Sequence, residues 1–374
     1  MSSDPRPTVV ILDASVAVTG SFRCAQRMAL LLSPWFRFVL VLPSAADISE
    51  HELHPFASVE RLPLAQLRKS VRSIAVYGPA LLTSGARLLR TLRDARAEVL
   101  IVNDFFLLQG WLARRLGWQG RILTWVRFDP DRFPRPIARL WLRAARSASD
   151  RIVAVSRFIE QRLPPKLEAV RLYDCIDPEL PAAAGSDRSA EDIAFVGNYI
   201  SGKGQDDAIE AFHRIAQRFR TARLLFFGGD MGLPKNRAYR AGLERRVEEL
   251  ELSGRVVFHD FASDLPSALA TARLALNLSR SESFSLSCLE AQQLGIPVVS
   301  YRSGGPEEII VDGETGCLID VGNVAGVASA MSRLLEDQAL AGRMGAAAAV
   351  SVRERFGPGA FIQAMLPLLR TQQA

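Results

Sequence analysis

Residues 192–219 read DIAFVGNYISGKGQDDAIEAFHRIAQRF. The run opens with short apolar residues that predict a buried strand, and a glycine-rich turn follows from Gly197 to Gly204. From about Asp206 to Phe219, apolar residues recur at helical spacing. A strand, a tight turn and a helix form the repeating unit of a doubly wound parallel sheet. This stretch therefore predicts an α/β fold.

The same alternation continues on both sides of this stretch. In the N-terminal half, TVVILDAS, FRFVLVLP, AEVLIVND, GRILTWVR and DRIVAVS read as strands with amphipathic runs between them. ARLLFFGG, RVVFHDF, LALNLS, PVVSYR and GCLID continue the pattern in the C-terminal half. We expect two Rossmann-like domains, residues 1–184 and 190–356, joined by the apolar-poor linker near 177–192, with a helix at 357–374 packing back on the first. Two such domains facing each other form a central cleft at the carboxyl ends of their strands.

Length and composition exclude several protein classes. The chain has 374 residues, 48% of them hydrophobic and 23% charged, which excludes wholesale disorder, a collagen-like fibre and a coiled coil. The start is polar, and no run of about 18 uncharged apolar residues occurs. The four cysteines lie far apart without metal-ligand spacing, which is typical of reduced thiols. We therefore expect a cytoplasmic protein.

Positive charge is concentrated in one stretch. Residues 61–157 hold 19 Lys and Arg against 6 Asp and Glu. The basic residues on amphipathic segments there include Arg68, Lys69, Arg72, Arg87, Arg90 and Arg93. Two interpretations stay open: peripheral binding to the inner face of an anionic cytoplasmic membrane, or a solvated arginine-rich face. Nucleic acid is not an expected partner, because few aromatic residues alternate with these arginines.

Three segments of the C-terminal half carry residues that could bind a ligand or take part in catalysis. FVGNYISGKGQ places Lys203 in a turn whose backbone N–H groups can bind phosphate, although a plain strand-to-helix turn is the alternative. It differs from a P-loop because no Ser or Thr follows the lysine, which makes a nucleotide hydrolase improbable. SESFSLSCLE holds Glu282 in a loop and Glu290 on a helix capped by Ser285 or Ser287. Such carboxylates can bind sugar hydroxyls.

YRSGGPEEI, the third segment, has a double glycine, Gly304 and Gly305, that permits close approach of the backbone. On spacing alone, a capped strand-to-helix turn is the stronger interpretation of it.

The three segments in this order resemble the C-terminal half of family-4 glycosyltransferases of the GT-B fold, over about residues 192–320. The resemblance implies that Lys203 binds the donor diphosphate, Glu290 the ribose and Glu282 the sugar. The further donor-binding residues that it implies are Gly197, Asn198, Gly204, His259, Phe261, Ser283, Phe284 and Ser285.

The N-terminal half resembles the family more loosely. TGSF, with Gly20 and Ser21, stands where the family has a glycine-rich loop near the donor phosphate. Asp104 and Arg127 are expected on the acceptor side, and Arg127 or Phe128 takes the place of the usual histidine. Asn198 stands where the family commonly has an arginine, and RLYDCIDPEL lacks the common Asn-Gly before its Asp.

The resemblance implies an enzyme: a retaining hexosyl-type glycosyltransferase that uses a nucleotide diphosphate sugar and no further cofactor. The acceptor would be a glycan or a lipid-linked glycan of envelope, lipopolysaccharide or exopolysaccharide synthesis. The alternative is an inactive relative that binds nucleotide sugar or membrane as a partner subunit. No metal is expected, because Asp129-Pro130-Asp131 is ordinary turn chemistry and the four histidines are scattered.

Overall fold

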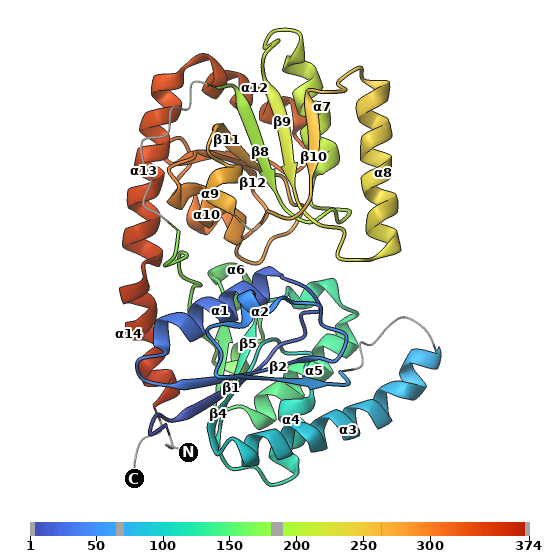
Figure 1. The fold of residues 1–374 in the computed structure, drawn as a ribbon, viewed down its shortest axis with the longest axis vertical. Helices are drawn as coiled ribbons and strands as arrows, with labels where there is room; N and C mark the ends of the chain where they lie inside the picture. The colour runs from blue at the N-terminus through green and yellow to red at the C-terminus, as the bar shows by residue number, and fades with distance from the viewer. Residues whose placement is uncertain (1–3, 65–70, 181–189, 263, 371–374) are drawn as a thin grey trace. The chain divides into compact units, whose positions relative to one another are not determined.

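Two units, each built on a parallel sheet, make up the chain (Figure 1). The computed structural model describes residues 4–64, 71–180, 190–262 and 264–370. Unit 1 comprises Met1–Cys175 and Pro358–Ala374, and unit 2 comprises Ile176–Gly357.

The sheet of unit 1 has the strand order β3-β2-β1-β4-β5-β6-β7. The strands are β1 (Thr8–Leu12), β2 (Arg37–Pro43), β3 (Ser58–Leu62), β4 (Ala97–Val102), β5 (Arg121–Val126), β6 (Arg151–Ala154) and β7 (Val170–Arg171). All pair in parallel, and the central strands are buried on both faces, which explains their continuous Val, Ile and Leu content. The order reverses between β1 and β4, the position at which such sheets bind ligands.

Helices cover both faces of this sheet. They are α1 (Gly20–Leu32), α2 (Glu50–Leu53), α3 (Val71–Asp94), α4 (Gln109–Arg115), α5 (Arg135–Ala148), α6 (Arg157–Glu160) and α14 (Pro358–Leu369), with 3-10 turns η1 (Pro130–Arg132) and η2 (Pro165–Leu167). On one face α3 packs on α4 and α4 on α5, while α1 packs on α14 at the other (Figure 1). Arg121 also donates to the carbonyl of Arg370 at 2.7 Å, which fixes the end of α14 in unit 1.

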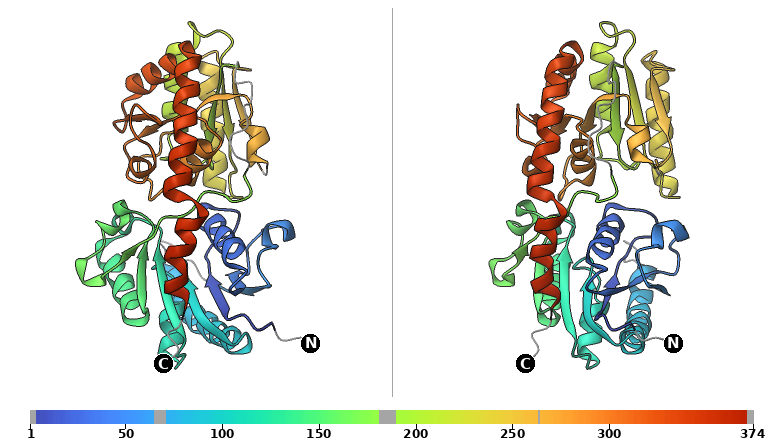
Figure 2. Two further views of the ribbon diagram at one scale, coloured as in Figure 1. Left: turned by 90° about the vertical axis from the view of Figure 1, so that its left-hand side faces the viewer. Right: turned by 60° about the vertical axis from the view of Figure 1, so that its left-hand side comes forward.

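Unit 2 repeats this topology with the strand order β10-β9-β8-β11-β12-β13. Its strands are β8 (Asp192–Val196), β9 (Arg223–Phe227), β10 (Val256–His259), β11 (Ala272–Asn277), β12 (Val298–Tyr301) and β13 (Gly316–Ile319). Its helices are α7 (Gln205–Ala216), α8 (Pro234–Glu249), α9 (Leu265–Ala268), α10 (Leu286–Gln293), α11 (Pro306–Ile309), α12 (Val324–Glu336) and α13 (Gln338–Phe356). Figure 2 shows α13 along the outside of this unit, where it packs on α10 and α12.

The core of unit 2 explains why the strand–turn–helix pattern is held. Ile209 and Phe212 of α7 are fully buried against Phe226 of β9 and Leu276 of β11. Removing a buried phenylalanine side chain costs about 3–5 kcal/mol. The apolar helix face predicted from residues 206–219 is therefore the face that packs against the sheet.

The boundary between the units differs from the expected one at residue 184. The chain passes to unit 2 after Cys175. Ile176 donates its backbone N–H to the carbonyl of Phe356 at 2.9 Å, and Asp177 exchanges two hydrogen bonds with the side chain of Gln293. These bonds tie the first part of the predicted linker to unit 2, and residues 181–189 lie outside the described residues.

Candidate functional site

The glycine-rich turn after β8 presents Lys203 at the carboxyl end of the sheet of unit 2. Its backbone is fixed from within, because Lys203 donates its N–H to the carbonyl of Ile200 at 3.0 Å. Gly204 has φ +88°, and a Cβ there would lie 2.1 Å from the carbonyl oxygen of Leu278. Only glycine fits such a position. The turn is thereby pressed onto the end of β11, and α7 begins immediately after it.

The structure brings together two of the predicted catalytic residues, Lys203 and Glu282. The Lys203 Nζ lies 2.8 Å from one carboxylate oxygen of Glu282 and 3.2 Å from the other. The two side chains are 33% and 17% exposed, so the ion pair is open to ligands. The backbone of Glu282 bonds to Ser303 and Gly305 at 2.9 and 2.8 Å, so the loop after β12 holds the carboxylate in place.

The loop from Ser283 to Ser285 is packed tightly between Glu282 and α10. A Cβ on Gly305 would lie 2.2 Å from the Cα of Phe284, which explains the double glycine. Ser285 caps α10, accepting from the N–H of Cys288 at 3.4 Å and from the side chain of Asn277 at 2.7 Å. Its φ of +98° is a strained conformation for a residue with a side chain, of the kind that gathers at functional sites.

Two further predicted donor residues line this part of the unit. Glu290 lies in the second turn of α10 and is half-buried, as is Ser283. Burial raises the pKa of Cys288, on the same helix, to about 12, so this thiol is not a nucleophile at neutral pH.

Asn198 joins the ends of two neighbouring strands. Its side-chain oxygen accepts the N–H of Gly229 at 3.0 Å, directly after β9. The strand ends approach closely here, since a Cβ on Gly228 would lie 2.1 Å from the carbonyl of Gly197. In place of the family's arginine, the amide thus has a positioning role within the turn.

His259 and Phe261 lie at the end of β10. The His259 ring stacks on Phe227 with centroids 4.8 Å apart and planes 8° from parallel, and its carbonyl accepts the Tyr199 hydroxyl at 2.8 Å. Phe261 is 47% exposed. An exposed aromatic ring beside these loops is suited to stacking on a flat base.

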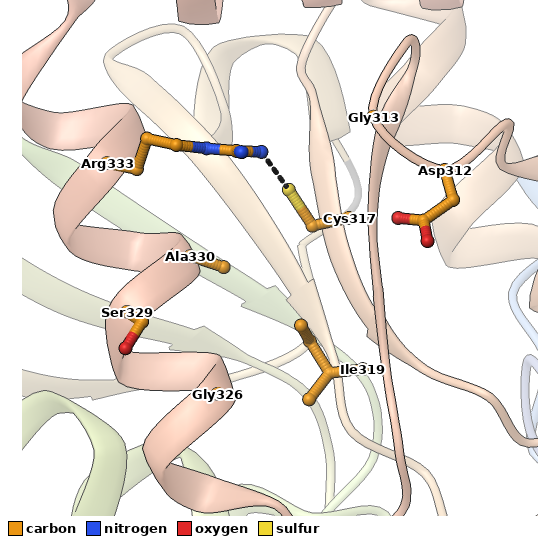
Figure 3. A pocket seen from close by; sticks show the side chains of 8 residues that line it. All are labelled: Asp312, Gly313, Cys317, Ile319, Gly326, Ser329, Ala330 and Arg333. Atoms are coloured by element: carbon orange, nitrogen blue, oxygen red, sulfur yellow. Dashed lines mark hydrogen bonds between the residues drawn. The ribbon is translucent and has the colours of Figure 1, made fainter.

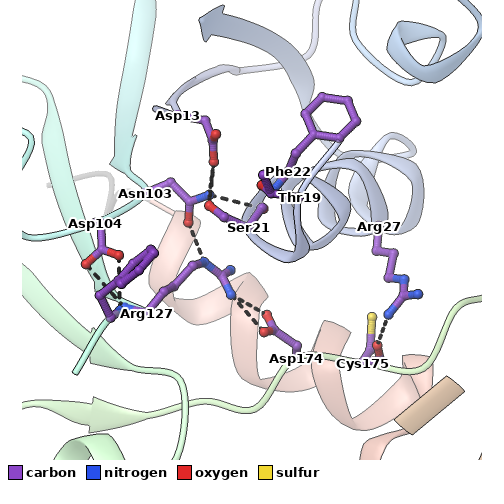
Figure 4. Close-up of polar contacts among 11 residues, drawn as sticks. Asp13, Thr19, Ser21, Phe22, Arg27, Asn103, Asp104, Arg127, Asp174 and Cys175 are labelled. Atoms are coloured by element: carbon purple, nitrogen blue, oxygen red, sulfur yellow. Dashed lines mark hydrogen bonds and ion pairs between the residues drawn. The ribbon is translucent and has the colours of Figure 1, made fainter. Parts of the chain in front are cut away.

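The residues predicted in the N-terminal half form a second group, within unit 1 (Figure 4). Gly20 and Ser21 open α1, whose cap is Thr19. The Ser21 hydroxyl donates to the buried carboxylate of Asp13 at 2.7 Å, and the Asn103 amide donates to the Ser21 hydroxyl at 2.8 Å. The loop after β1 is thus held by polar side chains from two strand ends.

Arg127 is buried rather than exposed to an acceptor. Its Nη1 donates to both carboxylate oxygens of Asp174, at 2.7 and 2.9 Å, and its Nε donates to Asn103 (Figure 4). The guanidinium also stacks 4.5 Å above the ring of Trp125. Its second terminal nitrogen, Nη2, is buried and has no hydrogen-bond partner among the residues that the structure describes. The guanidinium therefore joins the end of β5 to the segment that ends at Cys175, where the chain leaves unit 1. Its acceptor role stays a prediction.

Asp104 is 1% exposed and accepts backbone N–H groups of the neighbouring loops, from Phe105 at 2.9 Å and Phe128 at 3.1 Å. Burial raises its pKa to about 7. The geometry gives this carboxyl group a loop-holding role, and contact with an acceptor stays a prediction.

The Asp129-Pro130-Asp131 segment is a turn. Asp129 accepts the N–H of Asp131 at 2.9 Å, and both carboxylates lie within 4 Å of Arg162. Across residues 4–64, 71–180, 190–262 and 264–370, no group of three or more His, Cys, Asp or Glu is arranged to hold a metal ion.

A separate surface pocket of about 400 Å³ lies beside the edge strand β13 (Figure 3). In it Arg333 of α12 donates to the Cys317 sulfur at 3.2 Å. It contains none of the predicted site residues; its lining is Asp312, Gly313, Cys317, Ile319, Gly326, Ser329, Ala330 and Arg333.

Sequence analysis missed the residues that hold the predicted ones. Asp13, Asn103 and Asp174 form the polar network of unit 1, and Ser303 supports Glu282. A signal existed for the first two, because each is a polar residue directly after a buried strand. No local sequence signal pointed to Asp174, since its partner Arg127 lies 47 residues earlier in the chain.

Comparison with known proteins finds a family model that matches most of unit 2. Residues 177–350 match the glycosyl transferases group 1. N-acetyl-alpha-D-glucosaminyl L-malate synthase of Bacillus anthracis is 30% identical over 221 residues, which span 56% of this chain and 56% of that protein. GDP-mannose-dependent alpha-(1-6)-phosphatidylinositol monomannoside mannosyltransferase of Mycolicibacterium smegmatis is 28% identical over 64% of this chain and 67% of its own length.

Solved structures match over nearly the whole chain. Anabaena Alr3699/HepE, solved in complex with UDP-glucose, superposes with a TM-score of 0.81 at 20% identity, covering 97% of this chain and 99% of that one. Sucrose-phosphate synthase from Thermosynechococcus elongatus gives 0.79 at 19% identity, covering 97% and 98%. The predicted GT-B architecture of two Rossmann-like α/β domains is confirmed.

Proposed function

We propose that the protein transfers a sugar from a nucleoside diphosphate sugar to a glycan or lipid-linked acceptor. The GT-B fold, and the match of residues 177–350 to the glycosyl transferases group 1, support the proposal. The observation that carries the proposal is the Lys203–Glu282 pair. It lies after β8 and β11, the two strands between which the sheet order of unit 2 reverses. Ligands of doubly wound sheets bind at this point.

The chemistry of the transfer suits these residues. The bond from the anomeric carbon to the diphosphate breaks, and negative charge develops on the leaving oxygen. The Lys203 ammonium and the backbone N–H groups of the turn are the donors that would stabilise this charge, and Glu282 would accept from sugar hydroxyls. Removing one such donor costs about 10²–10³ in rate.

Retention of anomeric configuration forms part of the proposal. The acceptor hydroxyl attacks from the side the diphosphate leaves, and its proton passes to the departing phosphate oxygen. No side-chain nucleophile is needed, so the replacement of the family's histidine by the buried Arg127 leaves the reaction intact. Asn198 supports the turn through Gly229.

The membrane association is a further proposal, with action at the inner face of the cytoplasmic membrane. No helix among the described residues has the length and apolar content to cross a bilayer. Two relatives act on membrane or envelope molecules by name: the phosphatidylinositol monomannoside mannosyltransferase and a lipopolysaccharide core glycosyltransferase of Rhizobium meliloti. These names support an envelope acceptor.

Donor turnover tests the proposal. Purified protein is incubated with a panel of nucleoside diphosphate sugars, and the released nucleoside diphosphate is measured with Lys203→Ala and Glu282→Ala alongside. Lys235→Ala, an exposed lysine on α8, is the matched control. We expect turnover by the native protein and the control, and a loss of at least a hundredfold in Lys203→Ala. Binding of a nucleotide sugar without any turnover would instead support the inactive relative.

A further inference from the structure

The helix α5 of unit 1 carries a row of arginines along one side. Arg135, Arg139, Arg143 and Arg146 fall within an arc of about 80° at 100° per residue, and at 1.5 Å per residue the row is about 16 Å long. The opposite side of the helix is occupied by the core, in which Ala138, Trp141, Leu142, Ala145 and Ala148 are buried. The helix therefore presents its arginines outward, and they are exposed.

This row lacks neutralising partners within the protein. The helix contains no acidic residue. Arg146 lies 3.8 Å from the exposed carboxylate of Glu168, but in the described part of the chain Arg135, Arg139 and Arg143 form no ion pair. Like charges three and four residues apart on a helix repel each other. An anionic partner would remove this repulsion.

A large apolar side chain is exposed beside the row. Leu140 lies between Arg139 and Arg143 in sequence and is 62% exposed. The row therefore combines positive charge with exposed apolar surface.

We propose that α5, with Leu140, is a docking surface for an anionic phospholipid bilayer. Basic residues near an anionic leaflet contribute about 1 kcal/mol each. An exposed leucine side chain can enter the lipid interface, which the sugar–phosphate backbone of nucleic acid does not offer. The inference rests on the proposed function in one respect: such a surface would bring the enzyme to an acceptor held in the membrane.

Vesicle sedimentation tests the surface without requiring transferase activity. The full chain is mixed with vesicles of phosphatidylcholine alone or with 30% phosphatidylglycerol, at low and high salt. We expect binding to the anionic vesicles that weakens as salt rises. The triple variant R135Q/R139Q/R143Q should lose about a hundredfold in partition coefficient, by about 1 kcal/mol per charge.

The comparison variant is R87Q/R90Q/R93Q, which removes the same charge from exposed arginines of α3, the helix for which the sequence left membrane binding open. The proposal assigns the surface to α5 instead. It should retain most of the binding, while Leu140→Asn should weaken binding without changing its salt dependence. Equal binding to neutral and anionic vesicles, equal losses in both triple variants, or tighter binding to duplex DNA than to vesicles would overturn the proposal. Nucleotide binding, measured on the same samples, checks folding and reports separately on the proposed function.

Discussion

The buried Arg127–Asp174 ion pair makes a quantitative prediction about the stability of unit 1. Both side chains are under 10% exposed, so each charge has lost most of its hydration. Replacing Asp174 by Asn keeps the shape but leaves a buried charge without its counter-ion. Breaking a buried pair in this way costs about 3–5 kcal/mol. Because the buried Asp13 carboxylate also stabilises the charged guanidinium, we expect the lower end, about 3 kcal/mol.

The assay can observe unit 1 by itself. All five tryptophans, Trp35, Trp111, Trp118, Trp125 and Trp141, lie in residues 1–175. Urea unfolding followed by tryptophan fluorescence therefore reports on this unit.

Glu160→Gln is the control, because it breaks the exposed pair with Arg171 and should cost under about 1 kcal/mol. The double variant Arg127→Met with Asp174→Asn should recover part of the loss, because the buried guanidinium that lacks its counter-ion is removed. A loss under 1 kcal/mol in Asp174→Asn would refute the reasoning.

Two further predictions concern single positions. In Gly204→Ala the new residue would have a positive φ and its Cβ would clash with the Leu278 carbonyl, so this variant should destabilise unit 2 by at least about 1–3 kcal/mol and abolish nucleotide binding. Gly242→Ala lies inside α8 with open space around it and should stabilise the unit by about 0.5–1 kcal/mol. Circular dichroism melts of both variants measure these changes. The raised pKa of Asp104 means that the folded state holds a proton which the unfolded state releases above about pH 4, so this group's contribution to stability is lost as pH rises toward 7. Asp104→Asn should therefore gain in stability relative to the native protein between pH 5 and 8, measured by urea unfolding; a difference that stays constant with pH would contradict the assignment.

Much of the fold could be predicted, because the central strands are buried on both faces and their sequences are apolar throughout. The edge strand β3 (SVERL) was missed, since it is only partly buried and has no apolar run. The helices α12 and α13 were also missed. The helix α13 packs on α10, and its buried residues include small ones such as Ala348 and Ala349, which give a weak periodic signal.

The site was predicted best where residues are close in sequence. Lys203, Glu282 and Gly305 each lie in a segment with recognisable turn chemistry, and the sheet topology brings those segments together. Arg127 shows the limit of this reasoning. Its position after a strand was evident from the sequence, but its burial depends on Asp174, and long-range pairing of this kind leaves no local pattern.

The central claim is that the turn after β8 binds a diphosphate through the Lys203 ammonium. Titration calorimetry with nucleoside diphosphates, and with the matching nucleosides as controls, measures this directly. We predict that at least one diphosphate binds, that its nucleoside binds far more weakly, and that Lys203→Ala lowers the diphosphate affinity at least tenfold while Lys235→Ala leaves it unchanged. Equal affinity of the native protein and Lys203→Ala for every diphosphate, or no diphosphate binding at all, would contradict the claim.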